Sequence, residues 1–186
     1  MSKVLSEEEL SGLCARNDRQ AQEELYTRYA ARVLTLCRRY SDSADDAYDL
    51  MQDSLVKALK MMGSFHYRGP GSLYAWISRL AVNEALDRIR KRRLLFLPLD
   101  ILPPDETVEP DEDDFGKMSQ EEILGIISAL PPQQRAVFNM YCIEGYSHRE
   151  IAGMLGISEK GSAGLLAKAR IRLRKEINNL IKNSDR

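Results

Sequence analysis

Basic and aromatic side chains occur at two places in the chain with a spacing that suits nucleic-acid binding. The first is a glycine-rich stretch, residues 63–72, in which Phe65 and Tyr67 precede Arg68. Aromatic faces stack on unpaired bases and guanidinium groups pair with phosphates, so this arrangement suits single-stranded DNA. In the alternative reading, Phe65 anchors the loop to the core, and the basic residues at 88–93 are a solvated helix end that complements the helix dipole.

The second place is residues 148–166, whose spacing fits a helix-turn-helix. Ala152 is small enough for two helices to cross closely, and Gly156 tolerates the positive φ of a tight turn. Ser158 is placed to cap the second helix, whose N-terminus would point into a major groove. An ordinary helical hairpin that ends in glycine is the alternative. The expected shared core is Ile151, Leu155, Ile157 and Leu166, and the basic residues that follow are Lys168, Arg170, Arg172, Arg174 and Lys175.

A third stretch, residues 45–60, is predicted to form an amphipathic helix. Charged helix faces are usually solvated, so the residues by themselves indicate no partner there. The polar face consists of Asp46, Asp49, Gln52, Asp53 and Lys57.

Helices are needed to position these groups, and apolar residues recur with helical spacing through most of the chain. Ser6 and Glu9 have the spacing of a capping box, and Ser72 is predicted to cap the helix that carries Trp76 as a core residue. No strand pattern occurs, so the predicted fold class is all-α. Besides the short helix after Ser6, helices are expected at about 20–40, 43–62, 72–93, 123–130, 132–142, 149–155 and 159–181.

The net charge of −1 hides three segments of different charge. Residues 1–93 carry a net charge of +3, residues 94–116 carry −8, and residues 117–186 carry +4. Four prolines accompany the acidic residues of the middle segment, which favours an extended, flexible linker. We therefore expect two small helical domains, 1–93 and 118–186, joined by a linker at 94–117, with the helix-turn-helix in the second domain.

Several classes of protein are excluded. No apolar run approaches the length of a membrane span, and the acidic N-terminus has no signal-peptide core. Cys14, Cys37 and Cys142 are far apart, which favours a reducing cytoplasm over a disulfide framework. With only His66 and His148, a zinc site is not expected. No motif brings together a base, a nucleophile and an oxyanion group, so we expect neither an enzyme nor a cofactor.

Four segments together resemble the extracytoplasmic-function group of sigma factors, within the sigma-70 family. The resemblance extends from about residue 20 to residue 181 and covers two domains in the family's order. The segments are D-D-A-Y-D-L-M-Q-D-S-L at 45–55, S-L-Y-A-W-I-S-R-L-A-V-N-E-A-L-D-R-I-R-K-R-R at 72–93, L-P-P-Q-Q-R-A-V-F at 130–138 and E-G-Y-S-H-R-E-I-A-G-M-L-G-I-S at 144–158.

The resemblance implies a cytoplasmic factor that binds core bacterial RNA polymerase and directs promoter-specific initiation. The polymerase contacts would be the β′ clamp helices and the β flap, and an anti-sigma factor is expected as a further partner. The acidic linker would thread toward the active-centre and RNA-exit channels, where its charge would mimic nucleic acid. The residues that match the family's clamp-binding helix are Asp49, Leu50, Gln52 and Asp53.

The resemblance also assigns promoter DNA to both domains. The first domain would read and melt the minus-ten element, and the second would read the minus-thirty-five element as duplex. The expected minus-ten contacts are Phe65, Tyr67, Arg68, Arg79, Asn83, Arg88, Arg90 and Lys91. The expected minus-thirty-five contacts are His148, Arg149, Ser158, Glu159, Lys160, Ser162, Lys168 and Arg170.

The chain departs from the family pattern just after Ser158, where E-K-G-S-A-G-L-L at 159–166 replaces the common Glu-Gly-Thr-Val/Ser-Lys-Ser-Arg/Gln-Leu. Ala163 and Leu165 occupy the usual polar and basic reading positions, although bidentate contacts to guanine need Arg or Lys. We expect Lys160, the backbone and DNA shape to carry more of the recognition, with Leu165 against a thymine methyl or a partner protein. The departure motivates a second hypothesis, an adaptor that binds polymerase or a regulator with little sequence-specific duplex reading.

Overall fold

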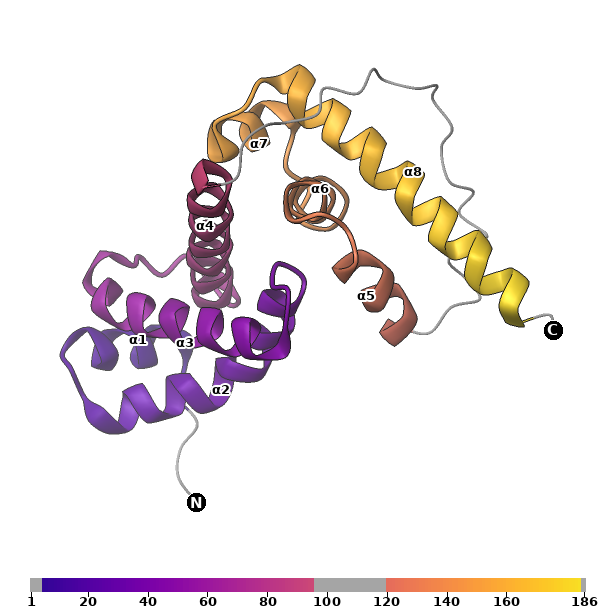
Figure 1. The fold of residues 1–186 in the computed structure, drawn as a ribbon. Coiled ribbons are helices and arrows are strands. Elements are labelled where there is room, and N and C mark those ends of the chain that lie inside the picture. Colours follow the sequence, from indigo (N-terminus) through magenta and orange to yellow (C-terminus); the bar gives the residue numbers. More distant parts are fainter. Residues whose placement is uncertain (1–4, 96–119, 185–186) are drawn as a thin grey trace. The chain divides into compact units, whose positions relative to one another are not determined.

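A computed structural model describes residues 5–95 and 120–184 of the chain. All the regular secondary structure in these two ranges is helical, with no strand (Figure 1). The predicted all-α fold class is therefore confirmed. Contacts divide the chain into two compact units, with the boundary between Ala85 and Leu86. Most of the predicted linker, residues 96–117, lies outside the described residues, and the domain boundaries at 93 and 118 stay a prediction.

The N-terminal unit is built from α-helices that begin at side-chain caps. The Ser6 hydroxyl accepts a hydrogen bond from the Glu9 backbone N–H at 3.1 Å, and the Glu9 carboxylate accepts one from the Ser6 backbone N–H at 2.9 Å. The predicted capping box is thus confirmed, while Asp18 and Ser43 cap the next two helices. The elements are α1 (Glu7–Ala15), α2 (Arg19–Arg38), α3 (Ala44–Lys60), the 3-10 turn η1 (Met62–Ser64) and α4 (Ser72–Leu95), which begins in this unit and continues past the boundary at Ala85.

The apolar stripes of these helices form the core of the unit. Helix α2 packs along α3, and α1 packs against α2 and η1 (Figure 1). Burial raises the pKa of the Cys14 thiol to about 11, so this side chain remains a neutral apolar group in the core at neutral pH. An ion pair of 2.8 Å between Lys57 Nζ and Glu84 Oε2 ties α3 to α4. Core residues of the first three helices include Leu10, Leu25, Val33, Leu50, Met51 and Leu55.

The start of α4 differs from the sequence prediction. Ser72 is the first residue of the helix, and its hydroxyl accepts a hydrogen bond from the Arg68 backbone N–H at 3.3 Å. The Gly71 and Leu73 backbone N–H groups donate instead to a carboxylate oxygen of Glu7, at 2.9 and 3.3 Å. The prediction that Ser72 caps α4 is therefore wrong, because a residue of α1 supplies the acceptor.

The C-terminal unit follows the predicted order of helices. Pro132 occupies the first turn of its helix, as expected from its fixed φ and missing N–H. The Arg135 side chain, only 1% exposed, donates from Nη1 to the Ser128 carbonyl at 2.6 Å and so joins two consecutive helices. The elements are α5 (Gln120–Ser128), α6 (Pro132–Phe138), the π-helical turn η3 (Asn139–Ile143), α7 (His148–Leu155) and α8 (Glu159–Ser184).

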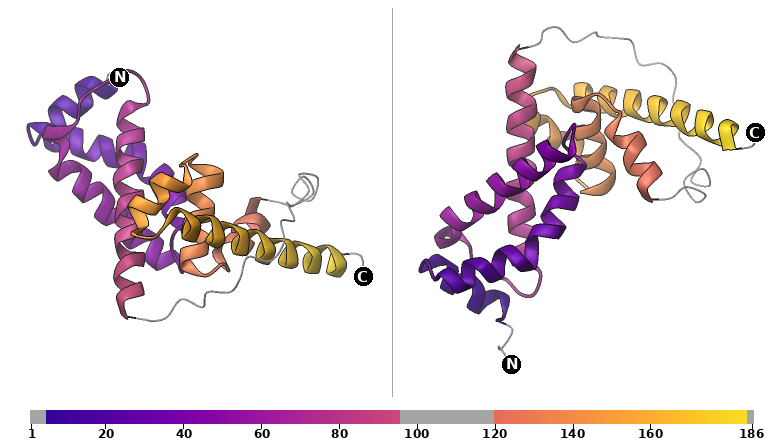
Figure 2. Two further views of the ribbon diagram at one scale, coloured as in Figure 1. Left: turned by 90° about the horizontal axis from the view of Figure 1, so that it is seen from above. Right: turned by 60° about the horizontal axis from the view of Figure 1, so that its bottom comes forward.

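Helix α8 is the element around which this unit packs. Helices α5, α6 and α7 each pack on it, and α8 continues as one long helix of 26 residues (Figure 2). Isoleucines 126 and 127 of α5 meet apolar residues of α8 in a buried cluster. Burying side chains of this size contributes roughly 2 kcal/mol each. The cluster consists of Ile126, Ile127, Leu130, Ala169, Leu173 and Ile177, with Ile123 and Phe138 packed against it.

Two glycines near the start of α8 differ in their surroundings, which gives a matched pair of variants. A Cβ at Gly164 would meet no atom within 4 Å, whereas one at Gly161 would lie 3.1 Å from Oγ of the capping Ser158. We predict that Gly164→Ala stabilises α8 by about 1 kcal/mol, because alanine has the higher helix propensity. Gly161→Ala should gain less or destabilise, because the new methyl group displaces the cap.

Hydrogen-exchange protection of the α8 amides in the two variants and the unaltered protein tests this prediction. Equal protection in both variants would contradict it.

Candidate nucleic-acid interface

The outer side of α3 carries three of the four residues that match the clamp-binding helix. Asp49 and Asp53 are exposed and Gln52 is half-buried, whereas Leu50 is only 2% exposed and belongs to the core. These positions recur at helical spacing, so the two carboxylates and the amide lie on one face. Leu50 therefore holds the helix on the unit, while its neighbours present polar groups to solvent.

Two large side chains on the same helix, which were not among the predicted contacts, are also exposed. Val56 is 47% exposed and continues the Asp49, Gln52 and Asp53 face by one more turn. Tyr48 is equally exposed, and Tyr26 on α2 is also exposed. The sequence signal that could have identified Val56 is an apolar residue outside the buried stripe of the helix. Exposed aromatic side chains are enriched in protein-binding surfaces, and polar groups are found at their rims.

The loop between η1 and α4 is anchored at its start by aromatic packing. The rings of Phe65 and Trp76 lie 5.4 Å apart between centroids, and both side chains are half-buried. The next three residues, His66, Tyr67 and Arg68, are exposed. The anchoring role that we considered for Phe65 is thus present, and it leaves the other aromatic and basic groups of the loop presented to solvent.

The end of the loop is held by a carboxylate from α1. Glu7 accepts hydrogen bonds from the backbone N–H groups of Gly71 and Leu73, and Gly69 and Gly71 have φ values of 120° and 86°. Only glycine adopts such values without strain, so these two residues allow the chain to turn into α4. Glu7 lies far from the loop in sequence, and no local signal connects it to the loop.

The basic residues of α4 lie on more than one side of the helix. Arg79, Asn83 and Arg90 are separated by four and seven residues, a spacing that places them along one face. Arg88, two residues before Arg90, lies on a different side. Arg90 forms an ion pair with Asp87, and Lys91 is exposed. Helix α4 thus carries cationic side chains along and around its length rather than in one row.

The helix-turn-helix forms as its spacing predicts. Gly156 ends α7 with φ 65° and ψ 42°, in the left-handed region that favours glycine. The Gly161 backbone N–H donates to the Ser158 hydroxyl at 3.0 Å, which confirms Ser158 as the cap of α8. Ile151 is fully buried and Ala152 nearly so, as expected where the two helices cross.

A polar contact joins α7 to α8 at the start of the motif. His148 Nδ1 lies 2.9 Å from the hydroxyl of Ser162, which is fully buried. The ring of Tyr141 stacks on His148 with centroids 4.5 Å apart, and Tyr141 is 38% exposed. The structure thus brings two of the expected minus-thirty-five residues together, with Ser162 turned inward. Tyr141 was not among the candidates, because its position on the preceding helix gave no signal of this stacking.

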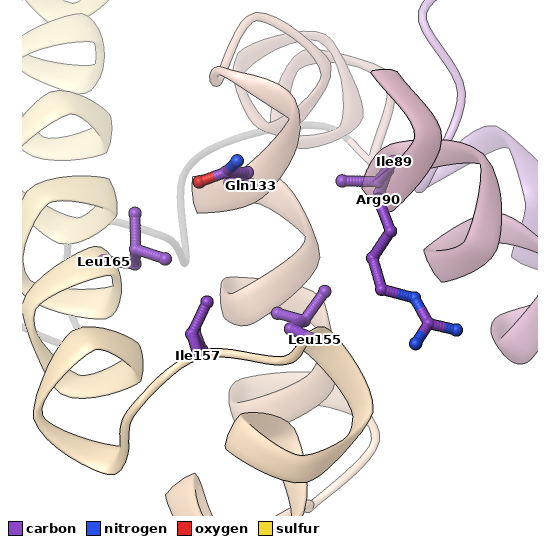
Figure 3. Close-up of a pocket in the computed structure, with 6 residues that line it drawn as sticks. All are labelled: Ile89, Arg90, Gln133, Leu155, Ile157 and Leu165. Carbon is purple, nitrogen blue, oxygen red and sulfur yellow. The ribbon is translucent and has the colours of Figure 1, made fainter. Parts of the chain in front are cut away.

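The side of α8 that faces away from the core has few large side chains near its start. Buried residues recur at 162, 166, 169 and 173, and Leu165 falls on the same stripe, close to Leu155 and Ile157 (Figure 3). Leu165 is therefore an inward residue rather than part of the outer face. The outer positions of the first turns are Lys160, Ala163, Gly164 and Ala167, followed by Lys168.

The remaining candidate residues of this unit are distributed around the motif. Arg149, Glu159 and Lys160 are exposed, and Lys168 and Arg170 are half-buried. Partial desolvation raises the pKa of the Cys142 thiol, and the positive charge of Arg170 partly opposes this rise. The cationic groups thus lie at the start of α8 and again two to three turns later.

The described residues contain no cluster of His, Cys, Asp and Glu placed to hold a metal ion. No helix within the same ranges is long and apolar enough to cross a membrane.

Comparison with known families identifies both units. The model of sigma-70 region 2 matches residues 25–94, and the model of sigma-70 region 4 matches residues 120–173. The first match contains the α3 face, the loop and α4, and the second contains the helix-turn-helix. Helix α1, which carries Glu7, precedes the first match.

Two curated relatives extend the similarity over most of the chain. The ECF RNA polymerase sigma factor SigM of Mycobacterium tuberculosis is 31% identical over 169 residues, which are 90% of this chain and 83% of SigM. The ECF RNA polymerase sigma-E factor of Salmonella typhimurium is 27% identical over 83% of this chain and 85% of its own. Among solved structures, the sigma factor RpoE in complex with the anti-sigma factor NepR from Bartonella quintana is similar, with 21% identity, a TM-score of 0.49 and coverage of 84% of this chain and 96% of that one.

The matches to regions 2 and 4 and the likeness to SigM show that the chain belongs to the extracytoplasmic-function sigma factors of the sigma-70 family, which are non-enzymatic factors that direct promoter-specific transcription initiation.

Proposed function

We propose that the outer face of α3 is the surface that binds core RNA polymerase. Asp49, Gln52 and Asp53 would contact the β′ clamp helices, with the exposed Val56 adding apolar area beside them. Leu50 would act indirectly, because its burial fixes the rotation of α3 about its axis. This division of roles follows from the exposure of each side chain.

We assign the minus-ten element to the loop and α4. Tyr67 and Arg68 are exposed at the centre of a loop that Phe65 and Glu7 hold at its two ends. Unpaired bases can stack on the Tyr67 ring, while phosphates pair with Arg68 and with the cationic residues of α4. The observation that carries this proposal is the fixed loop with its exposed aromatic and basic side chains beside a cationic helix. The expected helix contacts are Arg79, Asn83, Arg88, Arg90 and Lys91.

We assign the minus-thirty-five element to the helix-turn-helix. The N-terminus of α8 presents Lys160 beside the small residues Ala163 and Gly164, so the backbone can approach DNA closely. Ser162 is buried against His148 and would position α8 rather than touch a base. Phosphate contacts from Arg149, Lys168 and Arg170 would supply affinity. Ser158 and Glu159, at the start of α8, are the other residues proposed to contact the minus-thirty-five element.

The family resemblance supports four further proposals. The acidic segment at 94–117 would enter the basic channels of the polymerase, and the β flap would hold the second domain. An anti-sigma factor would occlude the polymerase-binding surfaces. The protein would act in the cytoplasm, where its polymerase is found.

Run-off transcription with purified core polymerase on matched promoters tests the whole assignment. Adding the protein should produce promoter-specific transcripts that core polymerase alone does not make. An absence of such transcripts would overturn the proposal.

Charge reversal on α3 tests the polymerase-binding face. We predict that Asp49→Lys weakens binding to core polymerase by roughly tenfold, because a cation replaces an exposed carboxylate at the interface. Glu23→Lys is the matched control, since Glu23 is exposed on α2 and its ion pair with Arg19 is solvated. Fluorescence titration of labelled protein with core enzyme measures both affinities. Equal losses in the two variants would point to net charge rather than to this face.

Removal of one cation from α4 tests the phosphate contacts. We predict that Lys91→Ala flattens the plot of log affinity against log salt concentration by about 0.7–0.9 for holoenzyme binding to promoter DNA, because one fewer counterion is released. Lys60→Ala, at the end of α3, removes an exposed lysine outside the proposed DNA surface and should leave the slope unchanged. An unchanged slope in Lys91→Ala would remove this residue from the phosphate contacts.

The second hypothesis is an adaptor with little sequence-specific duplex reading. The small side chains at the start of α8 agree with it, but the family matches over both units favour the first hypothesis. We predict that Lys160→Ala lowers minus-thirty-five-dependent initiation about fivefold, the effect of losing one charged contact. Transcription from promoters with and without the minus-thirty-five element separates the hypotheses. If replacing the minus-thirty-five element has no effect on transcription even with the unaltered protein, the adaptor hypothesis replaces the hypothesis of duplex recognition.

A further inference from the structure

Glu7, the first residue of α1, connects three separate parts of the N-terminal unit. Its Oε1 accepts a hydrogen bond from the Tyr29 hydroxyl at 2.9 Å. Its Oε2 accepts hydrogen bonds from the Gly71 and Leu73 backbone N–H groups at 2.9 and 3.3 Å. Both carboxylate oxygens are thus engaged, one with α2 and the other with the end of the loop and the start of α4.

The Glu7 carboxylate supplies hydrogen-bond acceptors for backbone N–H groups at the start of α4. The first N–H groups of a helix have no partner within the helix, and Ser72 does not supply one because its hydroxyl accepts from Arg68. A carboxylate at this position accepts the hydrogen bonds and also interacts favourably with the positive end of the helix dipole. Glu7 therefore acts as the cap of α4 from a distant part of the chain.

Tyr29 holds the carboxylate in place. Tyr29 is 3% exposed, and burial, followed by the hydrogen bond to Glu7, raises the pKa of its hydroxyl to about 12. The hydroxyl therefore remains a proton donor at any pH at which the protein would work. The Tyr29 ring stacks on the Tyr74 ring of α4 with 6.1 Å between the centroids, and the Arg32 guanidinium lies 3.7 Å from the centroid of the Tyr74 ring. The Glu7 carboxylate is thus held by a tyrosine that belongs to a packed cluster of two aromatic rings and one guanidinium group.

The result is a loop that is held at both ends. Phe65 packs on Trp76 at the start of the loop, and Glu7 binds Gly71 at its end. The exposed Tyr67 and Arg68 lie between these two anchors. Without the second anchor, the glycines at 69 and 71 would give this part of the backbone a wide choice of conformations.

We propose that Glu7 is a positioning residue for promoter opening. Its carboxylate fixes the end of residues 65–71, so that Tyr67 and Arg68 are presented in one conformation to the DNA strand that separates. The proposal rests on the proposed function of the loop and adds to it a residue of α1, which precedes the part matched by the region 2 model.

Three variants of Glu7 in the full chain, assembled with core polymerase, test the proposal. Glu7→Ala should slow promoter opening roughly tenfold, because it removes the acceptor. Glu7→Gln should stay within about twofold of the unaltered protein, because its carbonyl oxygen still accepts from Gly71 and Leu73 while its amide donates to Tyr29. Glu7→Asp keeps the charge but is one methylene too short, so it should resemble Glu7→Ala. Permanganate reactivity of unpaired thymines measures the rate of opening.

Three controls separate positioning from general destabilisation. Glu8→Ala removes an exposed carboxylate from the same first turn and should open the promoter normally. Binding of each Glu7 variant to core polymerase should be unchanged, and a promoter with a pre-formed mismatch bubble should partly rescue Glu7→Ala.

The outcomes are distinguishable. Normal opening by Glu7→Ala, equal defects in Glu7→Ala and Glu7→Gln, or a normal Glu7→Asp would overturn the positioning role, as would lost core binding in Glu7→Ala. Tyr67→Ala, run in the same assay, tests the loop itself. If Tyr67→Ala is defective and every Glu7 variant is normal, the inference fails and the proposed function stands. If Tyr67→Ala opens the promoter normally, the proposed function of the loop fails.

Discussion

The backbone N–H groups at the start of each helix need acceptors, and this requirement shapes the N-terminal unit. Helices α1, α2 and α3 meet it locally, with Ser6, Asp18 and Ser43. Helix α4 meets it with Glu7, 64 residues before Gly71. Because that carboxylate belongs to α1, the loop acquires its conformation only when α1, α2 and α4 have packed together. The geometry of the candidate DNA-reading loop is thus a tertiary property of the unit.

A second constraint is the charge of the DNA that a sigma factor must bind. A net charge of −1 by itself would not attract a polyanion such as DNA. It is, however, the sum of two cationic segments and one strongly acidic segment. Within α4 the cations lie along and around the helix, and within α8 they lie at the start and again past Ala167. The charge that matters for binding is therefore that of each surface, and the whole-chain value describes none of them.

The fold could be predicted well from local signals, because most of its helices begin and end at residues whose chemistry is short-range. The Ser6 and Glu9 capping box, the left-handed Gly156 and the Ser158 cap all have their partners within a few residues. The prediction for Ser72 failed because the competing acceptor, Glu7, is remote in sequence. The inward position of Leu165 follows from the helical stripe that it shares with residues 162, 166 and 169, whereas the family resemblance placed Leu165 at a DNA-reading position. The His148–Ser162 contact joins two helices, so it depends on a crossing geometry that spacing alone does not define.

The two units differ in how they would obtain specificity, and the difference follows from their side chains. In the N-terminal unit, an aromatic ring and a guanidinium group project from a loop with two anchors, which suits bases that have left the stack. In the C-terminal unit, the start of α8 offers Lys160 and then small residues, so few side chains reach base edges. A helix of this kind can lie closer to the duplex than one with long side chains, and the contact of the buried Ser162 with the half-buried His148 would fix its approach. Its discrimination would then depend on the width and deformability of the groove, whereas the loop would read the identity of individual bases.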